Sequence, residues 1–255
     1  ESLFIPSTVV NLEDGWCRNV SDLTNVTISP SNKNFKYLDE EHQIIVGKSD
    51  TKQEIFDTII FANRDIFYAT IPKYIKQGAF EDCKYLFTVE FEKDSELIFI
   101  GDYSFSNSFI NRITIPKNVC KICEAAFNCC HNLQNVTLEE GSKLVSFKSK
   151  LFMHNEKLDT VKIPENSALR SIHCDVFNGT KINQLFIPAS VEKIEDGWCE
   201  NNSKLEKVTL SPSNKNFRYL DNTHQIIVGK SDPNQCNFDT IIFVNRNIIH
   251  AKIPD

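Results

Sequence analysis

The residues best suited to do chemistry in this sequence are its nine cysteines, some of which are closely spaced. Cys120-x-x-Cys123 lies shortly before Cys129-Cys130-His131, and thiolates with an imidazole are the ligands that a structural zinc ion prefers. The second pair lacks the two-residue spacer of zinc-binding motifs, and Cys130 falls at a core position of a repeated pattern. We therefore predict no metal site and no cofactor, and we expect most cysteines to be reduced and buried. Disulfides between adjacent coils remain an alternative, because neighbouring strands lie about 5 Å apart.

The six histidines form no pattern typical of an active site. His42 and His224 occupy the same position in two copies of a long repeat, and a single active site is not normally duplicated in this way. The others fall in separate repeat units without a common nucleophile: His131, His154, His173 and His250. A triad can still assemble from distant residues, but no phosphate-binding loop, dinucleotide fingerprint or His-Glu-x-x-His motif occurs. The sequence therefore predicts that the protein is not an enzyme.

The overall composition narrows the class of protein. The 255 residues carry a net charge of −6, with 41% hydrophobic and 24% charged residues, which is typical of a globular chain. The acidic balance argues against a nucleic-acid partner, because nucleic acid selects a basic surface. No apolar run approaches the length that spans a bilayer, so we expect membrane attachment only through segments outside this chain.

Two internal repeats determine the architecture that positions these side chains. Residues 5–72 align with residues 187–254 at a constant offset of 182, without gaps and with most positions identical. A finer repeat is marked by an aromatic residue, at gaps of 25, 22, 25, 25 and 21 residues from Phe80 onward: Trp16, Phe80, Phe105, Phe127, Phe152, Phe177 and Trp198. Five to seven residues after each aromatic comes an apolar-x-x-apolar-x-apolar triplet: Leu23/Val26/Ile28, Leu86/Val89/Phe91, Ile110/Ile113/Ile115, Leu133/Val136/Leu138, Leu158/Val161/Ile163, Ile182/Leu185/Ile187 and Leu205/Val208/Leu210.

The spacing of the finer repeat predicts a leucine-rich-repeat-like solenoid. Each triplet ends in a period-2 alternation that is too short for a helix, so it indicates a strand of three or four residues. A unit of 21–25 residues with one such strand cannot bury its apolar side alone, whereas parallel stacking of the units builds one continuous core. We predict a mostly β fold of short parallel strands, one or more per coil, with short helical turns and the aromatics on the convex side.

Two segments interrupt the period and are predicted to be β-rich insertions. They cover about residues 31–70 and 213–252, and we expect them to rejoin the coil near Ile71-Pro72 and Ile253-Pro254. We predict that residues 1–255 nevertheless form a single solenoid. Because both ends of the chain lie within a repeat unit, we also expect the natural protein to continue on both sides with the same template.

Residues 115–138 carry a family resemblance. They follow the string Ile-Pro-x-x-Val-x-x-Ile-x-x-x-Ala-Phe-x-x-Cys-x-x-Leu-x-x-Val-x-Leu closely, with Ala126-Phe127, Cys130 and Leu133 in place. The chain resembles the BspA-like leucine-rich repeat family of bacterial and protozoan surface proteins, and its insertions resemble the trichomonad branch. The resemblance implies a cell-surface or secreted protein that mediates adhesion to host matrix proteins, host cells or other microbes. It implies no catalytic residue.

The surface best suited to such binding is the outward side of the predicted strands, because solenoids bind proteins through extended sheets. Candidate protein-binding residues alternate with the inward triplets: Thr27, Glu90, Arg112, Thr114, Thr137, Lys162, Phe186 and Thr209. Phe186 is the aromatic exception in a row of mostly threonine. We predict a non-enzymatic adhesion module that binds proteins. The alternatives are a structural spacer, which should lack a patch of exposed aromatics, and an intracellular interaction scaffold.

Overall fold

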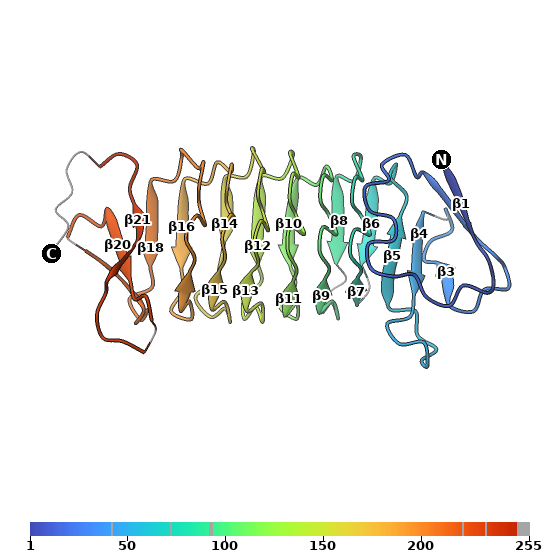
Figure 1. The fold of residues 1–255 in the computed structure, drawn as a ribbon, viewed down its shortest axis with the longest axis horizontal. Coiled ribbons are helices and arrows are strands. Elements are labelled where there is room, and N and C mark those ends of the chain that lie inside the picture. Colours follow the sequence, from blue (N-terminus) through green and yellow to red (C-terminus); the bar gives the residue numbers. More distant parts are fainter. Residues whose placement is uncertain (42, 72, 92–93, 221, 233, 249–255) are drawn as a thin grey trace.

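The protein is an elongated stack of β-coils, with β1 near one end and β21 near the other (Figure 1). A computed structural model describes residues 1–41, 43–71, 73–91, 94–220, 222–232 and 234–248. No helix occurs among these residues, so none is long and apolar enough to cross a membrane. The predicted class of fold, a solenoid of short parallel strands, is confirmed.

The predicted triplets form one side of the solenoid, which we call the first sheet. Its strands are β1 (Ser2–Ile5), β2 (Asn25–Ile28), β6 (Tyr68–Ile71), β8 (Thr88–Phe91), β10 (Arg112–Ile115), β12 (Asn135–Leu138), β14 (Thr160–Lys162), β16 (Gln184–Ile187) and β18 (Lys207–Leu210). The strands that pair do so in parallel and in register, so that Ile113 lies beside Val136 and Val136 beside Val161. Because side chains alternate across a strand, each apolar residue lies above its counterpart in one buried column.

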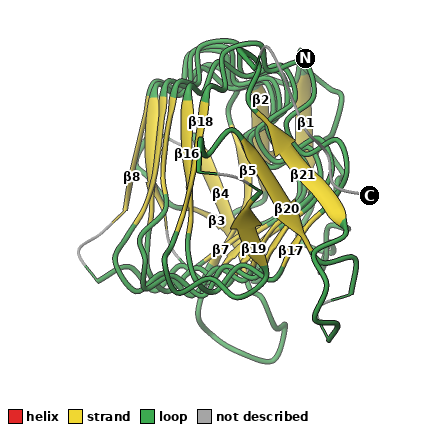
Figure 2. Ribbon diagram, turned by 90° about the vertical axis from the view of Figure 1, so that its left-hand side faces the viewer, coloured by secondary structure: helices red, strands yellow, loops and turns green. Residues whose placement is uncertain are grey.

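A second sheet of shorter strands forms another side of each coil (Figure 2). Its strands form two paired groups. The first contains β7 (Tyr74–Ile75), β9 (Phe99–Ile100) and β11 (Lys121–Ile122), and the second contains β13 (Ser146–Phe147), β15 (Ser171–Ile172) and β17 (Lys193–Ile194). Each strand ends in an apolar residue that is buried, such as Ile100 or Ile122. Two residues suffice because the chain turns immediately afterwards toward the next strand of the first sheet.

The connections between the two sheets are hydrogen-bonded turns that contain the repeated aromatics. Phe80, Phe105, Phe127, Phe152 and Phe177 are all fully buried. The backbone amide of each of these phenylalanines donates a hydrogen bond to a carbonyl of the next coil. The Phe105 amide, for example, donates to the Ala126 carbonyl at 2.8 Å. The turns expected to be helical are therefore single reversals of the chain rather than helices within the described residues.

Trp198 occupies a different position from the other repeat aromatics. The Phe177 amide donates to the Trp198 carbonyl, whereas the Phe152 amide donates to the Val176 carbonyl, so Trp198 aligns with Val176. Cys199 consequently takes the place of Phe177 in its coil and is buried. The indole compensates for the missing phenyl ring, because it packs edge-on against Phe177 at 6.1 Å.

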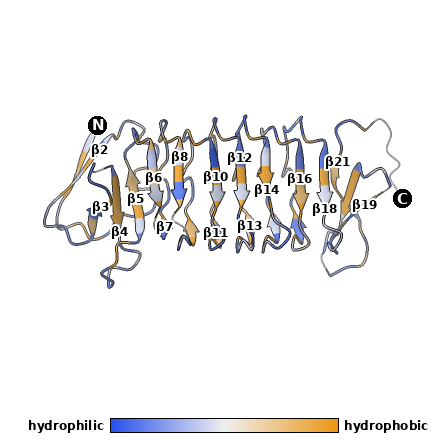
Figure 3. Ribbon diagram, turned by 180° about the vertical axis from the view of Figure 1, so that it is seen from behind, coloured by the Kyte–Doolittle hydropathy of each residue, from blue (hydrophilic) through white to orange (hydrophobic). Residues whose placement is uncertain are grey.

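Each predicted insertion contains an antiparallel meander. The first comprises β3 (Phe35–Tyr37), β4 (Ile44–Gly47) and β5 (Thr58–Ala62), and the second comprises β19 (Phe217–Tyr219), β20 (Ile226–Gly229) and β21 (Thr240–Val244). In Figure 3, β4 is hydrophobic along its length, which agrees with the complete burial of Ile44–Gly47.

The predicted boundary of the first insertion needs correction. β5 pairs in parallel with β7 of the second sheet, and β6 pairs in parallel with β8 of the first sheet. Residues 58–71 therefore form a further coil, with Ile66, Ala69 and Ile71 buried in the triplet positions. The parallel coil therefore resumes at β5, which pairs with β4 of the meander on one side and with β7 on the other, and not after residue 70. The corresponding end of the second insertion, at Ile253-Pro254, lies outside the described residues.

A tyrosine from each meander closes the free edge of a first-sheet strand. The Tyr37 hydroxyl donates to the Val26 carbonyl and accepts from the Ile28 amide, both at 3.2 Å. Tyr219 makes the same two bonds to Val208 and Leu210, at 3.2 and 3.0 Å. Each hydroxyl replaces a neighbouring strand at one point of the ladder, so β2 and β18 are capped edges.

Candidate interaction surface

The predicted strand-face residues all lie on the first sheet and point away from the core. Thr114, Thr137 and Lys162 are neighbours across three paired strands, and Arg112 lies beside Asn135. Five members of the set are exposed: Thr27, Glu90, Arg112, Thr114 and Lys162. The other three, Thr137, Phe186 and Thr209, are half-buried. Their placement is as the sequence predicts, and their role in binding stays a prediction.

The first sheet is interrupted at three points, and a hollow lies at each interruption. Among the described residues, no strand pairing joins β2 to β6, β8 to β10, or β14 to β16. A hollow of about 750 Å³ lies between β6 and residues 38–44. Hollows of about 480 and 340 Å³ adjoin β8 with β10 and β14 with β16. The face that the sequence predicts as a uniform sheet is therefore a row of short sheets separated by recesses.

Phe186 lies in the smallest of these three recesses. It lines the hollow between β14 and β16 together with Lys162 and Thr209. Its ring is half-buried, so it offers an apolar floor to a partner rather than a projecting anchor.

The sequence prediction missed a group of exposed aromatics beside the first sheet, which we call the aromatic ridge. It consists of Phe67, Tyr85, Phe87 and Phe109, with exposed fractions of 67%, 54%, 50% and 45%. Phe67 and Phe87 immediately precede β6 and β8, and each contacts the aromatic three residues before the next strand. The ring centroids of Phe67 and Tyr85 are 5.6 Å apart, and those of Phe87 and Phe109 are 6.5 Å apart.

The repeat pattern contains a signal for the ridge. The template places one buried aromatic per coil, so Tyr85, Phe87 and Phe109 are additional aromatics that the core does not need. A contiguous exposed apolar patch on a protein surface commonly marks an interaction site.

Farther along the solenoid, lysines take the place of the ridge aromatics. The position three residues before each strand holds Tyr85 and Phe109 in two coils, but Lys157, Lys181 and Lys204 before β14, β16 and β18. All three lysines are exposed. The rim of the first sheet is thus aromatic over β6–β10 and basic over β14–β18.

The cysteines mostly behave as core residues. Cys17, Cys83, Cys123, Cys130 and Cys199 are buried, Cys129 and Cys174 are half-buried, and all nine are free thiols. Burial raises the pKa of Cys83 and of Cys130 to about 12. The Cys130 sulfur donates to the Phe105 carbonyl at 3.0 Å, so it is committed to the core rather than to a metal. Among the described residues, no group of three His, Cys, Asp or Glu side chains is placed to hold a metal ion.

One surface group has the connectivity of a catalytic triad. The Ser171 hydroxyl lies 3.3 Å from His173 Nε2, and His173 Nδ1 lies 3.2 Å from the Glu195 carboxylate. Burial raises the pKa of Glu195, but the hydrogen bond from Lys193 and the charge of His173 bring it below its usual range. These contacts follow from strand geometry, because residues two apart share a face and Glu195 follows the Ile194 that lies opposite Ile172.

This group lacks the donors that acyl transfer requires. The amides of Ser171 and His173 already donate to carbonyls of the preceding coil, and the Cys174 amide donates to the Glu195 carboxylate at 3.2 Å. These three amides are therefore already hydrogen-bonded and are not available to form an oxyanion hole, which is usually the largest electrostatic contribution to such catalysis. We interpret the group as a surface hydrogen-bond network.

The coils, the two parallel sheets and the buried aromatic column define a leucine-rich-repeat type of solenoid. The family model for the BspA type leucine rich repeat region matches residues 54–168 and 141–223, with six copies. The chain belongs to the BspA-type leucine-rich repeat family. The match begins at residue 54, in agreement with the additional coil formed by residues 58–71.

Solved structures share this fold. A leucine-rich cell surface protein from Faecalibacterium prausnitzii is 22% identical, with a TM-score of 0.57 over 76% of this chain and 58% of that one. A leucine-rich repeat protein from Eubacterium ventriosum is also 22% identical, with a TM-score of 0.57 over 79% of this chain and 58% of the other. The chain therefore spans less than two thirds of either protein. No curated protein sequence matches it.

Proposed function

We propose that the chain is a cell-surface adhesion module that binds proteins of a host or of other microbes through the first sheet and its aromatic ridge. The observation that carries the proposal is the ridge itself, four aromatics with exposed fractions of 45–67% in two contacting pairs. Aromatic side chains dominate the binding energy of protein interfaces, because they bury a large area at a low cost in conformational entropy. A structural spacer that binds nothing is expected to lack such a patch of exposed aromatic side chains. Family membership and the named surface protein from Faecalibacterium prausnitzii support the location.

The lysine positions beyond the ridge favour a protein partner of mixed chemistry. A partner that places an apolar patch on the ridge and an acidic segment beside Lys157, Lys181 and Lys204 would contact one continuous rim. Charge complementarity of this kind selects among partners more than it adds affinity.

The test is a binding panel of immobilised matrix proteins, cultured epithelial cells and bacterial cells. The double variant Phe87→Ser, Phe109→Ser should bind at least about tenfold more weakly than the natural chain, since it removes two central aromatics. A matched control is Ile55→Ser, Val145→Ser, which removes two exposed apolar side chains away from the ridge. Equal binding by both double variants and the natural chain would show that the ridge has no part in adhesion.

A further inference from the structure

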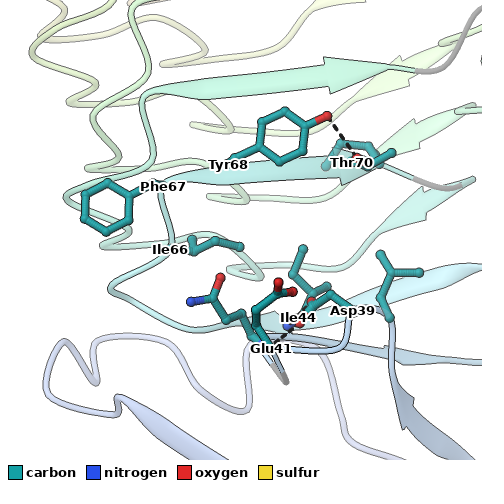
Figure 4. A pocket seen from close by; sticks show the side chains of 10 residues that line it. Asp39, Glu41, Ile44, Ile66, Phe67, Tyr68 and Thr70 are labelled. Carbon is teal, nitrogen blue, oxygen red and sulfur yellow. Dashed lines mark hydrogen bonds between the residues drawn. The ribbon is translucent and has the colours of Figure 1, made fainter.

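One hollow of the first sheet adjoins an edge of β6 that has no paired neighbour among the described strands. The hollow of about 750 Å³ lies between β6 and residues 38–44 of the first meander (Figure 4). On the β2 side the edge is capped by the Tyr37 hydroxyl. On the other side β6 has β8 as its single paired neighbour among the described strands.

The direction of the β6 backbone groups identifies what this edge offers. The amides of Phe87 and Thr88 donate to the Phe67 carbonyl, so Phe67 directs its backbone groups toward β8. Alternate residues of a strand direct their amides and carbonyls to opposite edges. Tyr68 and Thr70 therefore direct theirs toward the hollow, where they form the hydrogen-bonding edge of an incomplete sheet.

The walls of the hollow favour a particular kind of side chain. Its floor includes Ile44, Ile66 and Ile71, which are all buried. The ten lining residues include two acidic ones, Asp39 and Glu41, and no basic one. Both Asp39 oxygens accept backbone amides of the meander at 2.7 and 2.8 Å, whereas Glu41 is exposed at the rim.

We propose that this hollow receives an extended polypeptide segment of a partner, which pairs with the open edge of β6. The segment places an apolar side chain over Ile44, Ile66 and Ile71 and a basic side chain beside Glu41. Main-chain hydrogen bonds then supply affinity and the side-chain recess supplies selectivity, as in other cases of strand addition. This inference deepens the proposed function and rests on it, because it assigns one mode of protein binding to one end of the same surface.

The probe is a fluorescein-labelled peptide, Lys-Thr-Ile-Thr-Val-Thr-Lys, measured by fluorescence anisotropy against the intact chain. Two comparator peptides carry N-methyl groups on alternate backbone amides, one in each phase. Strand pairing predicts that one N-methylated phase loses at least about tenfold in affinity while the other is affected less, because only one set of amides faces β6. Equal binding of all three peptides would overturn strand pairing, and no binding of the unmodified peptide up to about 1 mM would overturn the site.

Two substitutions at one position separate the backbone from the side chain. Thr70→Pro removes the amide that faces the hollow and spares the ladder to β8, since proline is tolerated where the amide faces away from the sheet. We expect it to weaken the peptide about tenfold, whereas Thr70→Val, which keeps the amide, should change affinity less than about twofold. Glu41→Lys should weaken the lysine-bearing peptide by about three- to fivefold.

The outcome is distinguishable from that of the adhesion panel. Phe87 and Phe109 do not line the hollow, so the variant Phe87→Ser, Phe109→Ser should still bind the peptide fully. Loss of adhesion in that variant with no peptide binding by the natural chain would leave the proposed function standing and refute the strand site. If the natural chain binds the peptide but the variant Phe87→Ser, Phe109→Ser adheres as well as the natural chain, the strand site would stand and the role of the aromatic ridge in adhesion would be refuted.

Discussion

Phe80 and Phe105 stack face to face across adjacent coils, with ring centroids 4.9 Å apart and planes 3° from parallel. The column continues from Phe105 to Phe127 at 5.2 Å with an angle of 4°. Parallel rings follow from the repeat, because identical positions in successive coils differ only by a translation along the solenoid.

Because the rings stack, removal of one ring should lower the free energy of unfolding substantially. Phe105→Ala removes a fully buried side chain between two aromatic neighbours, so the free energy of unfolding should fall by about 3–5 kcal/mol in urea denaturation. Phe109→Ala is the control, because Phe109 is 45% exposed and its loss should cost within about 0.5 kcal/mol. Similar losses in both variants would show that the column is not the main support of these coils.

Removal of either tyrosine hydroxyl should lower the stability by the same amount, because Tyr37 and Tyr219 make equivalent contacts in the two long repeats. Tyr37→Phe removes two hydrogen bonds to the edge of β2 and leaves the ring in place, so stability should fall by about 1 kcal/mol. Tyr219→Phe should have the same effect on β18, since the contacts are the same.

Hydrogen exchange gives a local readout of the caps. The Ile28 amide should exchange faster in Tyr37→Phe, and the Leu210 amide should exchange faster in Tyr219→Phe. If neither amide changes, the hydroxyl contacts contribute nothing to the closed edges.

Much of the fold could be predicted from the sequence because the repeat is regular and strongly apolar. The triplet positions correspond to the observed strands, as with Ile113 and Ile115 in β10. The additional coil was missed because Ala69 is a weak apolar signal and Phe61 falls inside a strand-rich segment. The sequence predicts one or more strands per coil but does not locate those of the second sheet, because two residues, such as Phe99–Ile100, show no alternation.

The surface was less predictable than the core. The outward residues follow from the inward ones by alternation, so the strand face could be placed correctly. The interruptions of the first sheet precede β6, β10 and β16, where the triplet begins with isoleucine five residues after the aromatic instead of leucine six or seven residues after it. The repeat template alone does not show that this shorter spacing ends the strand pairing. The contact between Phe67 and Tyr85 could not be predicted either. Phe67 lies one residue before its strand and Tyr85 lies three residues before the next strand, so the two do not occupy equivalent positions of the repeat.

The thiols should differ widely in reactivity. Alkylation of the native chain at pH 8 should label Cys120 and Cys236, which are exposed, and leave Cys83 and Cys130 unmodified. Burial raises the pKa of each of the latter two from 9.0 to about 12, so at pH 8 both are neutral and enclosed. Mass measurement after proteolysis identifies the labelled sites, and rapid native labelling of Cys130 would contradict a core role.

The same pKa shift sets the direction of a pH effect. Above a pH of about 9 the unfolded chain loses thiol protons that the folded chain retains, so these two residues lower stability as the pH rises toward 12. Cys83→Ala should reduce this alkaline loss, although it also leaves a small cavity.

Phe186 offers a test of the recess between β14 and β16. Phe186→Ala should weaken adhesion and leave the thermal midpoint nearly unchanged, because the ring is half-buried on the outer face. Loss of stability with intact adhesion would show instead that Phe186 is a packing residue.

The most direct test of the central claim is the footprint of binding on the intact chain. Deuterium uptake should be compared between the free chain and the chain saturated with the panel protein that binds it. The account predicts protection of residues 67–71, 85–91 and 109–115, with no change in second-sheet strands such as Lys121–Ile122 and Ser171–Ile172. Protection confined to the second sheet, or no binding by any member of the panel, would contradict it.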